Sequence, residues 1–175
     1  MRITYKNLTI RNAEEKDCGQ LAAWWNDGKV MAHAGFPNGL GTTPEKVAAE
    51  LQRDADDTGR RLILELDGKP IGEMSYRNKG TGVAEIGIKI CDAEQQEKGY
   101  GRLALSMLIG ELFMMKYWKI VLDTNLTNLR AQHVYELLGF DRVRVNKNSW
   151  TDQLGKKQSS VDYELYENQF HNFAV

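Results

Sequence analysis

The sequence predicts one domain of the α/β (α+β) class, spanning residues 1–175, with a mixed, mostly antiparallel central sheet of about seven strands flanked by helices. A chain of 175 residues has the usual size of one domain and can bury a substantial core. Apolar runs separated by Asp-Gly and Asn-Lys-Gly turns in residues 61–90 indicate antiparallel neighbours. A strand, a helix and a strand in residues 83–124 indicate a right-handed parallel crossover.

Hydrophobic periodicity and turn residues predict the individual elements. Thr43 followed by Pro44 is typical of a helix start, and Gly139 is typical of a helix end. Residues 27–43, rich in glycine, read as a partly mobile loop, and the polar residues 146–160 read as a hairpin loop. The predicted strands are 7–11, 61–66, 71–77, 83–90, 118–124, 140–145 and 161–166, and the predicted helices are 14–26, 44 to about 57, 102–117 and 128–138.

A glycine-containing turn, Gln96-Glu97-Lys98-Gly99-Tyr100-Gly101-Arg102, follows an apolar strand and opens a helix. Glycines let the backbone approach a ligand closely, and the free N–H groups of the helix N-terminus favour an anion. Lys98 and Arg102 add positive charge, so the turn predicts a pyrophosphate site. The alternative is a solvated turn that only caps the helix.

Composition excludes several classes of function. The chain carries 24 acidic and 23 basic residues, and this balance argues against a nucleic-acid-binding surface. Cys18 and Cys91 lie too far apart in sequence for a disulfide framework, and the three histidines lack zinc-ligand spacing, so no metal is expected. No run of apolar residues is long enough for a membrane span, and the first six residues do not resemble a signal peptide. A cytoplasmic protein is expected.

A second motif follows the glycine turn at the appropriate distance. The segments Asn128-Leu129-Arg130-Ala131 and Tyr135-Glu136-Leu137-Leu138-Gly139-Phe140 lie on the next predicted helix. With the turn at residues 96–102, they make the chain resemble the GNAT superfamily of acetyl-CoA-dependent N-acetyltransferases. The resemblance covers nearly the whole chain and extends to the subgroup of ribosomal-protein N-terminal, aminoglycoside and polyamine acetyltransferases. It implies a GNAT fold whose parallel strands 4 and 5, residues 83–90 and 118–124, splay apart.

The resemblance also implies how acetyl-CoA would bind. The turn residues would hold its pyrophosphate, and the backbone of the preceding strand would pair with the amide-rich pantetheine arm. Asn128 would contact the cofactor from the next helix, and Tyr135 would stand near the sulfur. The cofactor-binding residues expected on this basis are Ile88, Lys89, Ile90, Gln96, Glu97, Lys98, Gly99, Tyr100, Gly101, Arg102 and Asn128.

Acetyl transfer to an amine requires a neutral nucleophile, a stabilised oxyanion and a protonated leaving thiolate. Tyr135 is the candidate acid, and a backbone N–H near Ile88 could hold the oxyanion. Glu85 is the candidate base, with Glu73 and His33 as weaker rivals. Neither cysteine has the setting of a nucleophile, so direct attack in a ternary complex is expected.

Other interpretations remain open at the level of sequence. Gly99-x-Gly101-x-x-Ala104 with Asp123 also fits a dinucleotide-binding fingerprint, although about eight residues separate Ile90 from Gly99. A catalytically silent GNAT-like domain that binds CoA or a partner is a second alternative. The acceptor, a primary amine of a small molecule or of a protein N-terminus, is not identified by the sequence, and homodimer formation stays open.

Overall fold

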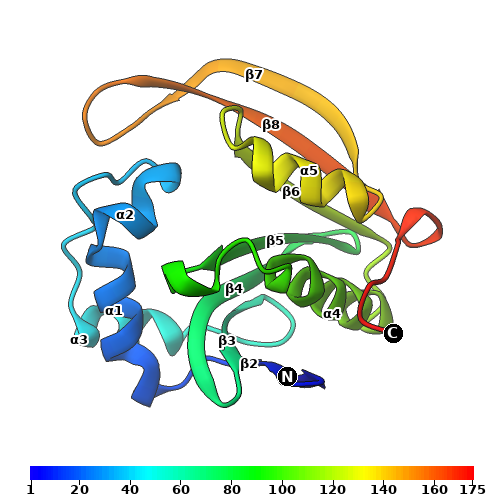
Figure 1. Cartoon of the computed structure of the whole chain (residues 1–175), viewed down its shortest axis with the longest axis horizontal. Coiled ribbons are helices and arrows are strands. Elements are labelled where there is room, and N and C mark those ends of the chain that lie inside the picture. Colours follow the sequence, from blue (N-terminus) through cyan, green and yellow to red (C-terminus); the bar gives the residue numbers. More distant parts are fainter.

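The computed structural model describes residues 1–175 and contains one eight-stranded sheet in the order β1-β2-β3-β4-β5-β6-β8-β7 (Figure 1). All neighbouring strands are antiparallel except the parallel pair β5–β6, so the predicted mixed, mostly antiparallel sheet is confirmed. The strands are β1 (Arg2–Tyr5), β2 (Leu8–Asn12), β3 (Gly59–Leu66), β4 (Lys69–Gly80), β5 (Val83–Ile90), β6 (Lys119–Asn125), β7 (Asp141–Thr151) and β8 (Lys157–Tyr166).

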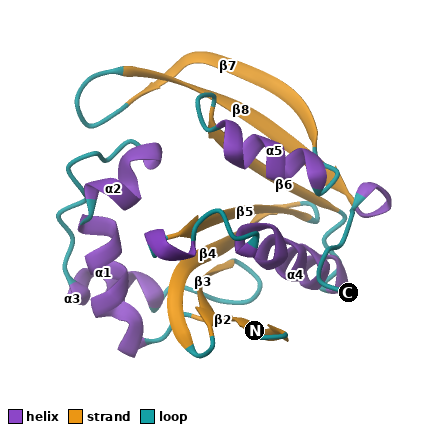
Figure 2. Cartoon of the chain, in the orientation of Figure 1, coloured by secondary structure: helices purple, strands orange, loops and turns teal.

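Five α-helices flank the sheet: α1 (Cys18–Asn26), α2 (Gly28–Met31), α3 (Pro44–Leu51), α4 (Tyr100–Met114) and α5 (Leu129–Leu137) (Figure 2). The predicted start of α3 is confirmed, because the Thr43 hydroxyl accepts a hydrogen bond from the N–H of Lys46. The helix ends earlier than predicted. The Asp54 carboxylate accepts hydrogen bonds from the backbone N–H and the guanidinium of Arg61, and these bonds turn the chain into β3.

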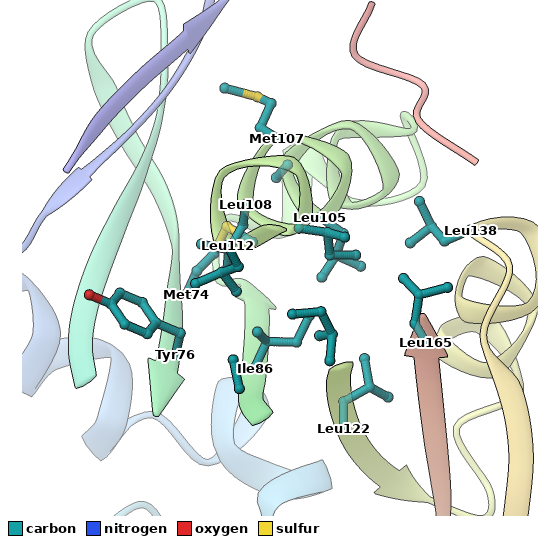
Figure 3. Close-up of a cluster of buried hydrophobic side chains, with 14 of the residues drawn as sticks. Met74, Tyr76, Ile86, Leu105, Met107, Leu108, Leu112, Leu122, Leu138 and Leu165 are labelled. Atoms are coloured by element: carbon teal, nitrogen blue, oxygen red, sulfur yellow. The ribbon is translucent and has the colours of Figure 1, made fainter. Parts of the chain in front are cut away.

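The helices form two layers. Buried residues of α1, α2 and α3 pack with Ile63 in a small core on one face of the sheet. A larger core of 25 buried residues lies on the other face, under α4 and α5. Figure 3 shows Leu105, Leu108 and Leu112 of α4 in this larger core, close to sheet residues such as Met74 and Ile86. This packing fixes the N-terminus of α4 close to the end of β5.

Three predictions about the elements were wrong. Residues 2–5 form an eighth strand, whose four residues are too few for a clear strand signal. Residues 27–43 are not all loop, because they contain α2 and a short 3-10 helix, Ala32–Ala34. Most of residues 146–160 extend β7 and β8 into a long hairpin. The edge strand β7 exposes both faces to solvent, and its polar sequence after residue 145 therefore carries no strand signal.

A buried ion cluster fixes the start of α1 to the sheet. Arg11 is only 6% exposed, and its guanidinium donates to both carboxylate oxygens of Asp17 and, at 2.8 Å, to Glu65. Burial alone raises the pKa of Asp17, but hydrogen bonds from Arg11 and from the N–H of Glu14 outweigh it and hold that pKa below its ordinary value of 3.8. Because the folded-state pKa is lowered, the cluster stabilises the fold at neutral pH, and this contribution is lost as the pH falls below that ordinary value.

Arg11→Ala is expected to lower the free energy of unfolding by about 3 kcal/mol at pH 7, because two buried carboxylates lose their partner. Urea denaturation monitored by circular dichroism measures the loss. Arg144→Ala is the matched control, since it breaks an exposed ion pair with Asp162, and a change within about 0.5 kcal/mol is expected. Equal losses in the two variants would contradict the role of the buried cluster.

Candidate functional site

The glycine turn presents a row of backbone donors. None of the backbone N–H groups from residue 97 to residue 102 has a backbone acceptor, and the first bond of α4 is donated by Leu103 to the carbonyl of Gly99. Glu97 and Gly99 both have positive φ, of 60° and 82°, which turns consecutive N–H groups toward one side. Together with the dipole of a 15-residue helix, these donors suit a phosphate or pyrophosphate.

Side chains hold the turn against its neighbours. The Gln96 amide donates to the carbonyl of Ile90 at the end of β5 (2.9 Å). Glu97 forms an exposed ion pair with Arg130 of α5 (2.8 Å). The exposed Lys98 contacts Gln95 and supplies a cation at the rim. The guanidinium of Arg102 lies 4.4 Å from the ring centroid of Phe173, so it packs on the C-terminal segment.

The parallel pair β5–β6 separates soon after it begins. Val83, Ala84 and Glu85 pair with residues 119–121, and no pairing continues beyond them. On its other side β5 stays paired with β4 up to Ile90. The edge of β5 from residue 86 to residue 90, which includes Ile88, Lys89 and Ile90, therefore faces an opening toward β6. This is the splay that the resemblance implied, and it leads directly to the glycine turn.

Asn128 and Tyr135 belong to α5, the first as its N-cap and the second as one of its buried residues. Asn128 caps the helix, because its Oδ1 accepts from the N–H of Ala131 (3.3 Å) and its Nδ2 donates to Thr124 (3.4 Å). Tyr135 is 7% exposed and packs edge-on against Tyr163 of β8, with ring centroids 5.5 Å apart. Phe140 is its second aromatic neighbour, with ring centroids 5.9 Å apart.

The environment of Tyr135 keeps its hydroxyl protonated. Burial raises the pKa of Tyr135 to about 12, and the neighbouring charge of Asp123 and the neighbouring Tyr163 add to the effect. The same hydroxyl makes no hydrogen bond to another side chain. The Tyr135 hydroxyl therefore carries its proton at neutral pH.

A cavity of about 310 Å³ lies against β4 and β5 on the side of α1, α2 and α3; we refer to it as the central cavity. Its apolar walls come from Trp25, Met31, Leu40, Met74 and Ile88, and its charged groups are Glu50, Arg61, Glu73 and Lys89. Because Ile88 also belongs to the open edge of β5, the cavity meets the opening at this residue. A small ligand in the cavity and a chain along β5 would thus meet.

The structure separates the two candidate carboxylates. Glu73 is 7% exposed and lines the central cavity, where its Oε1 accepts from the Trp25 indole (2.8 Å) and from Lys89 (3.1 Å). Glu85 lies in a neighbouring depression and forms ion pairs with Arg77 (2.6 Å) and Lys79 (3.4 Å). Glu73 is thus the carboxylate that faces the cavity.

Two side chains that contact Glu73, those of Trp25 and Lys89, were not predicted from the sequence to do so. Trp25 was not among the predicted site residues, and the structure shows it buried with its indole donating to Glu73. Lys89 was expected to contribute its backbone, and its side chain also pairs with Glu73. The pairing of Lys89 with Glu73 could have been found from the register of β4 and β5, because the two residues are direct cross-strand partners.

The remaining candidates lie elsewhere or have other surroundings. His33 is exposed on the short 3-10 helix after α2. The dinucleotide-binding alternative is wrong, because the sheet has a single parallel pair and a 3-10 turn, Ala93–Gln95, separates β5 from the glycine turn. No helix in the structure combines the length and the apolar character that crossing a membrane requires.

Comparisons with known proteins identify the family of the chain. A family profile described as "Acetyltransferase (GNAT) domain" matches residues 7–141. The proteins named aminoglycoside N(6')-acetyltransferase type 1 from Klebsiella pneumoniae and from Serratia marcescens are each 28% identical to this chain over 155 residues, covering 78% of it and 75% of the relative.

Solved structures share the fold. A spermidine N-acetyltransferase from Vibrio cholerae, in complex with CoA and spermine, superposes with a TM-score of 0.81 at 23% identity, covering 93% of this chain and 97% of that one. A ribosomal-protein-alanine N-acetyltransferase from Brucella melitensis gives a TM-score of 0.77 at 22% identity, with 90% and 98% covered.

Proposed function

The chain belongs to the GNAT acetyltransferase family, and from this premise we propose that it transfers an acetyl group from acetyl-CoA to a primary amine of a small molecule or a protein N-terminus. Residues 1–175 would act as one domain, by direct attack of the amine in a ternary complex. The observation that carries the proposal is the continuous path from the unpaired N–H groups of residues 97–102, along the open edge of β5, to the central cavity.

We assign the cofactor as follows. The pyrophosphate of acetyl-CoA lies on the N–H groups of the glycine turn, with Lys98 adding positive charge at its rim. The pantetheine arm adds to the open edge of β5 at Ile88, Lys89 and Ile90, as an extended chain adds to a sheet. Asn128 borders this path from the start of α5. The thioester would then reach the opening beside Tyr135.

The chemistry follows from this placement. The amine nitrogen attacks the thioester carbonyl and forms a C–N bond, while the oxyanion accepts a hydrogen bond from a backbone N–H near Ile88. Collapse of this intermediate breaks the C–S bond, and Tyr135 donates its proton to the leaving thiolate. The proton lost by the amine goes to an acceptor-side carboxylate, for which Glu85 and Glu73 are the candidates. Burial and location in the cavity favour Glu73.

Glu73→Gln is expected to lower kcat/KM for the amine at least tenfold and to leave acetyl-CoA affinity unchanged, because it removes the carboxylate charge of Glu73 and keeps the shape of the side chain. Glu85→Gln is the matched variant. Its carboxylate lies in the neighbouring depression and not in the central cavity, so we expect a loss below about threefold. Steady-state kinetics with either substrate varied measures both. A larger loss in Glu85→Gln would return the role to Glu85.

The acceptor is tested with amines of three classes. Two of them follow from the names of the relatives: spermidine and an aminoglycoside such as kanamycin. The third is a peptide with an N-terminal alanine, the kind of group named in the ribosomal-protein enzyme. Release of free thiol and a mass gain of one acetyl group on the amine are the expected results. Acetyl-CoA binding without turnover of any amine would instead favour the catalytically silent alternative.

A further inference from the structure

We propose that Gln153, at the tip of the β7–β8 hairpin, is a positioning residue that holds one wall of the central cavity and thereby sets the affinity for the acceptor. The inference rests on the proposed function, because it takes the central cavity as the acceptor site. It concerns the segment of residues 35–42, here called the capping loop, which connects α2 to α3 through the wall of that cavity.

Gln153 makes three hydrogen bonds to the capping loop across more than one hundred residues of sequence. Its Oε1 accepts from the N–H of Asn38 (2.8 Å), and its Nε2 donates to the carbonyl of Gly39 (2.9 Å). Its backbone N–H donates to the carbonyl of Gly35 (2.8 Å). One residue thus satisfies backbone groups at three positions of a loop that no strand pairs with.

The capping loop fits tightly between the hairpin and α1. Gly35 has a φ of +92°, and a Cβ there would lie 2.4 Å from the Trp150 ring of β7. Gly39 has a φ of +76°, and a Cβ there would lie 2.1 Å from the carbonyl oxygen of Asn26. Both positions therefore require glycine, and the close fit leaves the loop a single position relative to the hairpin.

The same loop carries the cavity wall. Leu40 and Thr42 line the central cavity. The N–H of Leu40 donates to the carbonyl of Trp25 (2.8 Å), whose indole reaches Glu73. The side chain of Asn26 brackets Thr42 through both its N–H (2.7 Å) and its carbonyl (2.9 Å). A displacement of Gly39 would therefore move the wall that faces Glu73.

The hairpin is built to present Gln153 in a fixed position. Asp152 Oδ1 accepts from the backbone N–H groups of Leu154 and Lys156, both at 2.9 Å, and its Oδ2 accepts from the Gln158 amide. These bonds lock the turn on either side of Gln153. Figure 1 shows the hairpin extending well beyond α5 to lie over α2, where the contacts to the capping loop are made.

The test compares Gln153→Ala and Gln153→Glu with Leu154→Ala, which truncates a neighbouring side chain that is 66% exposed. Gln153→Ala removes both side-chain bonds. Gln153→Glu keeps the acceptor for Asn38 but sets a carboxylate oxygen against the carbonyl of Gly39. In both Gln153 variants the KM for spermidine, kanamycin or the alanine peptide is expected to rise about three- to tenfold, with kcat within about twofold of wild type.

Two readouts separate this positioning role from general damage. The affinity for acetyl-CoA, measured by calorimetry, is expected to stay unchanged, and amide hydrogen exchange is expected to become about tenfold faster in residues 35–42 and not in the sheet. Unchanged exchange, or an equal rise in the acetyl-CoA dissociation constant, would overturn the inference. If wild-type protein turns over none of the three amines, the proposed function fails. The exchange experiment then still decides whether Gln153 holds the loop.

Discussion

Gly101→Glu is expected to weaken acetyl-CoA binding at least about 100-fold while the protein stays folded. The new carboxylate would stand among the N–H donors of residues 97–102 and repel the pyrophosphate that we place there. The substitution is not expected to destabilise the fold. A Cβ at Gly101 meets nothing within 4 Å, its φ is not in the positive range, and an acidic residue in the first turn of a helix is favourable.

The measurement is calorimetric titration of acetyl-CoA, accompanied by a thermal melt of each protein. Gly110→Ala is the control, because it adds a methyl group to the same helix where the nearest atom, on Asn172, is 3.9 Å away. Its acetyl-CoA affinity should equal that of wild type. Full binding by a folded Gly101→Glu protein would show that the cofactor lies elsewhere.

Tyr135→Phe is expected to lower kcat at least about 100-fold and to leave acetyl-CoA affinity unchanged. The phenyl ring keeps the packing against Tyr163 and Phe140, and the lost hydroxyl has no side-chain partner, so stability should change by less than about 0.5 kcal/mol. What disappears is the proton that we propose for the leaving thiolate. With a pKa of about 12, that proton is present throughout the pH range of ordinary assays.

The neighbouring tyrosine provides the control. Tyr163→Phe removes a hydroxyl that donates to Glu136 (3.3 Å), next to the same aromatic cluster. Its kcat should remain within about threefold of wild type. A similar loss in both variants would point to disturbed packing, and an unaffected Tyr135→Phe would exclude the tyrosine as the acid.

The sequence predicted the parts of the fold that rest on strong local signals. The two glycines Gly99 and Gly101 predicted the turn at residues 96–102. Thr43 followed by Pro44 predicted the start of one helix, and Gly139 predicted the end of another. The splay between β5 and β6 came from the resemblance to a family. No local pattern states that pairing stops at Glu85.

Long-range contacts account for what the sequence did not predict. The capping loop looked mobile because glycines lower local order, but Gly35 and Gly39 are there to let Trp150 and Asn26 approach closely. The partnership of Trp25 with Glu73 joins residues 48 positions apart, and only the packed structure brings them together. The polar second half of the edge strand β7, after residue 145, lacks the alternation on which strand prediction depends.

Two-substrate initial-rate kinetics test the central claim most directly. Thiol release would be followed while acetyl-CoA and an accepted amine are varied together. Direct attack in a ternary complex predicts double-reciprocal lines that intersect, because both substrates must be bound before either product forms. Parallel lines would contradict this account, because they would reveal an acetylated enzyme. Neither cysteine is suited to carry the acetyl group: Cys18 is buried, and burial raises the pKa of Cys91 to about 12.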